Sequence, residues 1–270
     1  VTGDVSNNGY IQAANDLTLG AGSYADSSSS VLEAGNAMTL TLVDGANING
    51  TVSAADLALV ADHMVAGLSA VITASNNADI STTGDMIFQG QTSPTSSGAV
   101  LQAGDLSLSS QAGLIDVQAG AQVSSNGTLD LITTNDLNIA GLVSAGDDLT
   151  VSSADLTIGA DGYLRSDADV SITAEDVDVT GSIVGDTIVL SASNLIVNEV
   201  SSGGAVAASG LIYAVNTQTI TVQDQLNVLG QITTEAGDLS IISNDMWVGD
   251  NGQVVTGHDM AITLTGDLET

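Results

Sequence analysis

A short pattern of alternating polar and apolar positions recurs along the whole chain. It reads Asp, an apolar residue, any residue and a second apolar residue, as in DLTV at 148–151 and DLTI at 155–158. Alternation with a period of two is typical of a β-strand with one buried face. Further copies are DLTL (16–19), DLAL (56–59), DLSL (105–108), DVSI (169–172), DLSI (238–241) and DMAI (259–262). The pattern predicts many short strands built in the same way.

The copies are regularly spaced, which predicts a repeat protein. Cutting the chain before the first strand of each repeat gives blocks of similar length, with two longer, loop-bearing blocks at 56–84 and 186–216. A block of about 20 residues without a helix holds about three short strands, as in 148–168 with DLTV, ADLTIG and GYLRS. We therefore predict an all-β fold over 1–270, namely one continuous single-stranded parallel β-helix of 11–12 coils.

In this fold, each inward side chain stacks on its counterpart one coil later. Apolar residues make up 43% of the chain but aromatic residues only 2%, which indicates a narrow core filled by aliphatic side chains. The contacts expected from the best-matched repeats are Leu149 with Val170, Val151 with Ile172, Leu156 with Val177, and Ile158 with Val179.

Two alternatives compete with this interpretation. A β-sandwich also has alternating strands, but its strands need not recur at a constant spacing behind the same Asp. The segment 56–71, DLALVADHMVAGLSAV, also fits an amphipathic helix with Asp56 as its N-cap. Its first four residues match the strand pattern, so we favour a strand followed by a loop.

Both ends of the sequence look like half a coil. The chain opens with VTGDVSNNGYIQAAN and closes with DMAITLTGDLET, and neither segment has the composition of a polar cap. An uncapped terminal coil exposes a sheet edge that tends to associate. We expect the coils at Val1 and Thr270 to meet flanking coils of the same protein or a second copy, end to end.

The charge of the chain limits its partners. There are 32 acidic residues against a single basic one, Arg165, which gives a formal net charge of −31. Binding to nucleic acid needs basic side chains that neutralise phosphates, so this class of partner is excluded. No apolar run reaches the roughly 18 residues of a spanning helix, so we expect no membrane insertion. Neutral sugars, cations and basic protein surfaces remain as partners.

The repeats DLTL, GDLSL, GDDLTV and ADLTIG, at a period near 20, resemble the shaft repeats of filamentous haemagglutinin-like exoproteins, the two-partner-secreted adhesins of Gram-negative bacteria. The resemblance covers nearly the whole chain. It implies a right-handed β-helical stalk, extracellular or on the bacterial cell surface, that serves adhesion, biofilm formation or contact-dependent delivery.

The repeated Asp is the main candidate for chemistry. Stacked coils place the carboxylates of one corner about 4.8 Å apart, where they repel one another. One interpretation is that each carboxylate accepts backbone hydrogen bonds at its turn. The other is Ca²⁺ bound between coils, with Asp148, Asp169, Asp155 and Asp176 as weak candidates. No other cofactor is indicated, and we favour the turn interpretation.

An enzyme is not expected. The chain has no Lys, and its histidines, His63 and His258, lie far apart in the sequence. Carboxylates that recur on every coil indicate a structural role rather than a local site. We predict a structural shaft, with a glycan- or cell-binding module as the alternative. Such a module would use loop 91–98, loop 197–210 or the scattered aromatic residues Tyr10, Tyr24, Phe88, Tyr163, Tyr213 and Trp247.

Overall fold

The computed structural model describes residues 3–91, 98–202 and 205–270. These residues form strands and turns and contain no helix, so none of them could cross a membrane as a helix. The parallel strands stack into an all-β solenoid of about 12 turns with roughly 21 residues each, which confirms the predicted fold class. The chain divides into two compact units. Unit 1 comprises Val1–Asn135 and Gly141–Val143, and unit 2 comprises Asp136–Ala140 and Ser144–Thr270.

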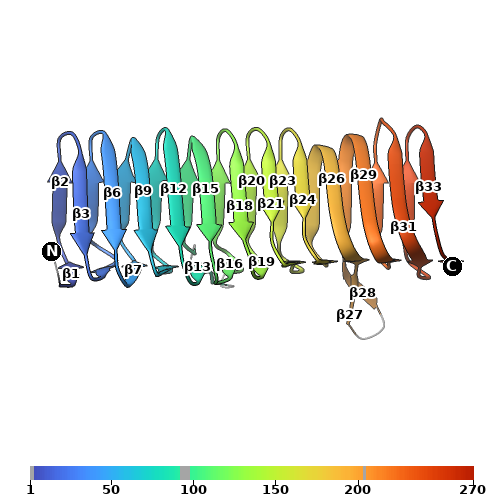
Figure 1. The fold of residues 1–270 in the computed structure, drawn as a ribbon, viewed down its shortest axis with the longest axis horizontal. Helices are drawn as coiled ribbons and strands as arrows, with labels where there is room; N and C mark the ends of the chain where they lie inside the picture. Colours follow the sequence, from blue (N-terminus) through green and yellow to red (C-terminus); the bar gives the residue numbers. More distant parts are fainter. Residues whose placement is uncertain (1–2, 92–97, 203–204) are drawn as a thin grey trace. The chain divides into compact units, whose positions relative to one another are not determined.

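Each turn of unit 1 contributes one strand to each of three faces, and the strands within a face pair in parallel (Figure 1). We call them the A, B and C faces. The A face contains β3 (Leu17–Ala21), β6 (Ala37–Leu42), β9 (Asp56–Ala61), β12 (Asn77–Thr82), β15 (Asp105–Ser110) and β18 (Leu129–Thr133). The B face contains β1 (Val5–Asn7), β4 (Tyr24–Asp26), β7 (Gly45–Ile48), β10 (His63–Ala66), β13 (Met86–Phe88) and β16 (Ile115–Val117). The C face contains β2 (Tyr10–Ala13), β5 (Val31–Ala34), β8 (Thr51–Ala54), β11 (Val71–Ala74), β14 (Val100–Ala103) and β17 (Gln122–Ser125).

Unit 2 has the same three faces, named in the same chain order, and β20 (Leu142–Ala145) is divided between the units. Three long strands bend from one face to the next: β26 (Ser182–Val197), β29 (Leu211–Val228) and β31 (Leu239–Val248). The shorter A-face strands are β21 (Leu149–Ser152), β24 (Val170–Thr173) and β33 (Met260–Leu264). The shorter B-face strands are β19 (Leu137–Ile139), β22 (Asp155–Ile158), β25 (Asp176–Val179) and β34 (Leu268–Glu269). The shorter C-face strands are β23 (Tyr163–Ser166), β30 (Gln231–Thr234) and β32 (Gln253–Thr256).

The core consists of aliphatic ladders, as predicted. Leu149 lies beside Val170 and Val151 beside Ile172 on the A face, and all four side chains are buried. On the B face the structure likewise pairs Leu156 with Val177 and Ile158 with Val179. Removing each of these side chains from water stabilises the fold by roughly 25 cal/mol per Å² of apolar area. This burial, repeated on every turn, is the main source of stability.

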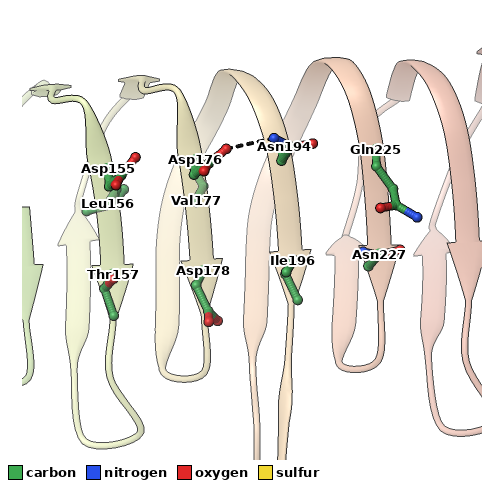
Figure 2. A pocket seen from close by; sticks show the side chains of 10 residues that line it. All are labelled: Asp155, Leu156, Thr157, Asp176, Val177, Asp178, Asn194, Ile196, Gln225 and Asn227. Atoms are coloured by element: carbon green, nitrogen blue, oxygen red, sulfur yellow. Dashed lines mark hydrogen bonds between the residues drawn. The ribbon is translucent and has the colours of Figure 1, made fainter. Parts of the chain in front are cut away.

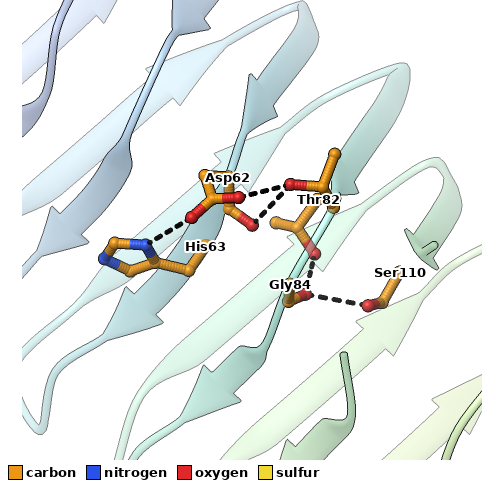
Figure 3. Close-up of polar contacts among 6 residues, drawn as sticks. Asp62, His63, Thr82, Gly84 and Ser110 are labelled. Atoms are coloured by element: carbon orange, nitrogen blue, oxygen red, sulfur yellow. Dashed lines mark hydrogen bonds and ion pairs between the residues drawn. The ribbon is translucent and has the colours of Figure 1, made fainter. Parts of the chain in front are cut away.

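Buried hydroxyl groups donate hydrogen bonds to backbone carbonyl oxygens at the corner between the A and B faces. Figure 3 shows Thr82 and Ser110 directed at the same carbonyl oxygen, that of Gly84, at 2.7 and 2.8 Å. One turn later, Thr133 donates to the Gly113 carbonyl oxygen at 2.7 Å. A buried carbonyl group without a partner would cost about 1–3 kcal/mol, so these hydroxyls stabilise the corner.

The segment 56–71 is not helical. It forms β9 and β10, so the predicted strand is confirmed, the helix alternative is wrong, and part of the expected loop is a second strand.

The longer turn of unit 1 lies one turn later than predicted. Leu57 and Ala78 are register partners at the usual spacing of one turn, whereas the interval from Ala78 to its next partner, Leu106, is longer. The boundary at 56–84 was wrong because β12 begins Asn-Ala-Asp-Ile and lacks the Asp-Leu start.

The longer turn of unit 2 is where it was expected. Ile188 on β26 and Gln218 on β29 are register partners, although the chain between them is longer than an ordinary turn. The extra residues include an antiparallel hairpin of β27 (Glu199–Ser202) and β28 (Ala205–Ser209), which projects from unit 2 in Figure 1. The other predicted loop, around Pro94, falls within 92–97 and lies outside the described residues.

Candidate functional site

Where an A-face strand starts with Asp, the carboxylate can bind to the next turn. In unit 1, Asp16 Oδ1 accepts hydrogen bonds from Asn36 Nδ2 at 2.7 Å and from the Ala37 backbone nitrogen at 3.2 Å. The hydrogen bond from Asn36, together with the one from Ala37, lowers the pKa of the Asp16 carboxyl. In the same way, Asp105 Oδ1 accepts from the backbone nitrogen of Thr128 at 2.8 Å. The expected backbone hydrogen bonds are thus present, but at Asp16 and Asp105 they come from the next turn and not from the residue's own turn.

Neutral residues separate these carboxylates in unit 1. The residues that precede the first inward position on consecutive A-face strands are Asp16, Ala37, Asp56, Asn77, Asp105 and Thr128. No two Asp residues are neighbours in this row. Because like charges about 4.8 Å apart repel even in water, this alternation reduces the cost of repeating Asp.

Unit 2 places the four Ca²⁺ candidates at two different corners. Asp148 and Asp169 precede paired A-face strands, and Asp148 Oδ1 accepts the Asp169 backbone N–H at 3.3 Å. Asp155 and Asp176 are register partners at the start of the B face. Asp176 Oδ1 accepts from Asn194 Nδ2 at 2.7 Å. Each pair offers two carboxylates, and within the described residues neither forms a group of three metal-ligating side chains.

A shallow groove of about 380 Å³ crosses the B face of unit 2 (Figure 2). Its outward side chains form two rows, each with one residue from β22, β25, β26 and β29. The first row is Asp155, Asp176, Asn194 and Gln225. The second row is Thr157, Asp178, Ile196 and Asn227. The groove therefore has carboxylates at one end and amide groups at the other.

An exposed aromatic ring continues the second row. Asn227 is the register partner of Trp247, and Trp247 is the partner of Glu269. The Trp247 residue is 36% exposed, and it borders a second hollow of about 140 Å³ together with Gln225 and Asp245. Amides and carboxylates that can bind hydroxyl groups thus lie beside a ring on which a flat apolar surface can stack.

Four other aromatic residues are less suited to stacking on a ligand, because they are buried or bonded to a carboxylate. Tyr24 and Phe88 are fully buried and belong to the core of unit 1. The hydroxyl groups of Tyr10 and Tyr213 donate hydrogen bonds to Glu33 and Glu235, respectively. These bonds raise the pKa of both phenols.

Each histidine contacts carboxylates of its own unit. His63 lies in unit 1, where its Nδ1 is 3.5 Å from Asp62 Oδ2 (Figure 3). A hydrogen bond from Thr83, more than the one from His63, lowers the pKa of Asp62. His258 lies in unit 2, with Nδ1 2.5 Å from Asp238 Oδ1 and 3.9 Å from Asp259 Oδ2. The hydrogen bond with Asp238 raises the pKa of His258 and lowers that of Asp238.

Sequence reasoning did not find the groove. Asn194, Gln225 and Asn227 lie outside the Asp-led repeats, and the hairpin separates Asn194 from Gln225 in the chain. Their common row becomes visible only from the pairing of β26 with β29.

Comparisons with family models, curated proteins and solved structures gave no match.

Proposed function

We propose that the protein is a structural segment of an extracellular fibre or of a large bacterial surface adhesin, comparable to the filamentous haemagglutinin-like shafts that its repeats resemble. The main support for this proposal is the continuous pairing of parallel strands from turn to turn within each unit. Successive turns pair strand by strand and are joined by corner carboxylates and hydroxyls. Such a structure grows by addition of similar turns and needs no active site.

End-to-end contact through the last turn of unit 2 is part of this proposal. Among the described residues, β33 pairs only with β31, so its other edge is open. Met260 and Ile262 occupy ladder positions that are buried on other strands, yet they are 42% and 40% exposed. A further turn with the same pattern would cover them and continue the hydrogen-bond ladder. Sedimentation of the wild-type protein and of an edge variant tests this contact.

The groove on the B face of unit 2 favours a second candidate function, the binding of a carbohydrate. Trp247 provides a stacking surface, and Gln225 and Asn227 provide donors and acceptors for hydroxyl groups. The surrounding carboxylates favour neutral or cationic sugars over acidic ones.

A glycan array tests this second function, with Trp247→Ala as the variant and Tyr10→Ala as its control. Both residues are exposed aromatics, but Tyr10 lies in unit 1, outside the groove. Loss of binding in W247A alone supports the carbohydrate function. Equal binding by both variants and the wild type contradicts it.

A further inference from the structure

We propose that Asp238, His258 and Asp259 form a binding site for a divalent transition-metal ion such as Zn²⁺, linking two consecutive turns of unit 2. Among the described residues this is the one group of three metal-ligating side chains whose ligand atoms all lie within 4.8 Å of one another. The site is separate from the groove and from the four Asp residues considered for Ca²⁺. The inference does not rest on the proposed function.

The solenoid itself brings the two carboxylates together. Leu239 on β31 and Met260 on β33 are register partners, so Asp238 and Asp259 occupy the same corner on consecutive turns. The Asp259 backbone nitrogen donates to Asp238 Oδ1 at 3.2 Å, which fixes this register.

The backbone before His258 is held tightly against the preceding turn. The Gly257 nitrogen donates to the Thr234 carbonyl oxygen at 2.9 Å. A Cβ atom at Gly257 would lie 1.9 Å from the Glu235 carbonyl oxygen, so only glycine fits there. The next residue, His258, is thereby positioned over the carboxylate pair.

The donor set selects the class of metal. One imidazole nitrogen and two carboxylate oxygens suit Zn²⁺, Ni²⁺ or Cu²⁺, whereas Ca²⁺ takes about six to eight oxygen ligands. All three side chains are exposed, and in the complex their ligand atoms would lie about 2.0–2.2 Å from Zn²⁺. Three protein ligands leave a coordination position for water. The ion would also offset two carboxylate charges, which no Lys or Arg does here, since Arg165 is the only one in the chain and pairs with Asp167.

The chain contains a similar corner that lacks the imidazole and has Asp167 in the place of Gly257. Asp148 and Asp169 have the same carboxylate-to-amide bond, at 3.3 Å, and the residue before Asp169 is Ala168. The backbone nitrogens of Ala168 and His258 both donate to a corner hydroxyl, that of Ser166 and Thr256, respectively. Position 168 is therefore the structural counterpart of position 258.

The test is calorimetric titration of Zn²⁺ into chelator-treated protein, at a pH where His258 is neutral. We expect one site in the wild type, binding at least about tenfold weaker in His258→Gln, and unchanged binding in His63→Gln. Histidine NMR signals should show that His258, and not His63, responds to Zn²⁺. Folded Ala168→His should bind a second ion. No binding by the wild type, equal binding in H258Q, or no second ion in A168H would overturn the proposal.

Discussion

Asp105 Oδ1 lies 2.8 Å from the backbone nitrogen of Thr128, one turn further along unit 1. The same oxygen also accepts from the Thr128 hydroxyl at 3.2 Å. Asp105 therefore connects consecutive turns, as Asp16 does. That explains why Asp recurs at strand starts and why its partners are backbone N–H groups and short polar side chains.

Removal of this connection should destabilise unit 1. We expect Asp105→Ala to lower the free energy of unfolding by about 1 kcal/mol, because the Thr128 amide loses its acceptor. Asp130→Ala is the control, since Asp130 also carries a negative charge on the A face but forms no side-chain hydrogen bond with any described residue. Chemical denaturation of both variants measures the difference. Equal effects would show that net charge, and not the bond between turns, decides stability.

A buried amide weakens the core of unit 2. Gln218 occupies a ladder position between Ile188 and Leu239, and its Nε2 has no hydrogen-bond partner among the described residues. Its Oε1 accepts from the Thr234 hydroxyl at 3.1 Å. We expect the double variant Gln218→Leu/Thr234→Val to raise the free energy of unfolding by about 1 kcal/mol, because apolar groups of similar size replace a half-satisfied pair.

The single variant Gln218→Leu is the control, because it leaves the Thr234 hydroxyl buried without its acceptor. Thermal unfolding should rank the double variant above the wild type, and the wild type at or above the single variant. A double variant less stable than the wild type would contradict this explanation.

Alkaline pH should destabilise unit 1 through Tyr24. Burial, with the nearby Asp26 carboxylate, raises the pKa of the Tyr24 phenol to about 12. The phenol of the unfolded chain titrates near 10, so the unfolded state loses its proton first. The stability that Tyr24 contributes is complete below pH 10 and decreases as the pH rises toward 12, by about 2 kcal/mol in total.

Denaturation midpoints measured across this pH range test the effect, with Tyr24→Phe as the variant. Phe cannot ionise, so this variant should lose the Tyr24 part of the decrease. The exposed Tyr10 provides the control as Tyr10→Phe, which should keep the Tyr24 part of the decrease and lose only the part that comes from the bond between Tyr10 and Glu33. The same pH profile in the wild type and Y24F would contradict the role of Tyr24.

Much of this fold could be predicted from the sequence because its rules are local. The alternation in DLTV and DLTI identifies inward residues, and the repeat length fixes which residues stack, as Leu149 and Val170 show. Alternation also holds at β12, but its Asp-Leu start is missing, because Ala78 takes the inward position that Leu57 and Leu106 take on its neighbours.

The groove could not be predicted in this way. Asn194 lies beside Gln225 only because the hairpin between them projects from the turn and takes no part in the register of β26 with β29. The sequence does not show how many residues belong to this hairpin. Outward residues also follow no apolar pattern, so a shift in register leaves no sign in the sequence. The Asp238–His258 contact was missed for a related reason, since its partners are distant in the sequence and become neighbours only through the stacking of turns.

Sedimentation velocity over a range of protein concentrations is the most direct test of the central claim, that turns continue through the open edge of β33. We predict that the wild type forms concentration-dependent assemblies and that Ile262→Lys, at the open edge, abolishes them. Ile242→Lys is the control, since Ile242 is 44% exposed but lies on β31, which is paired on both sides. It should assemble like the wild type. Identical monomeric behaviour of all three proteins at every concentration would contradict end-to-end stacking.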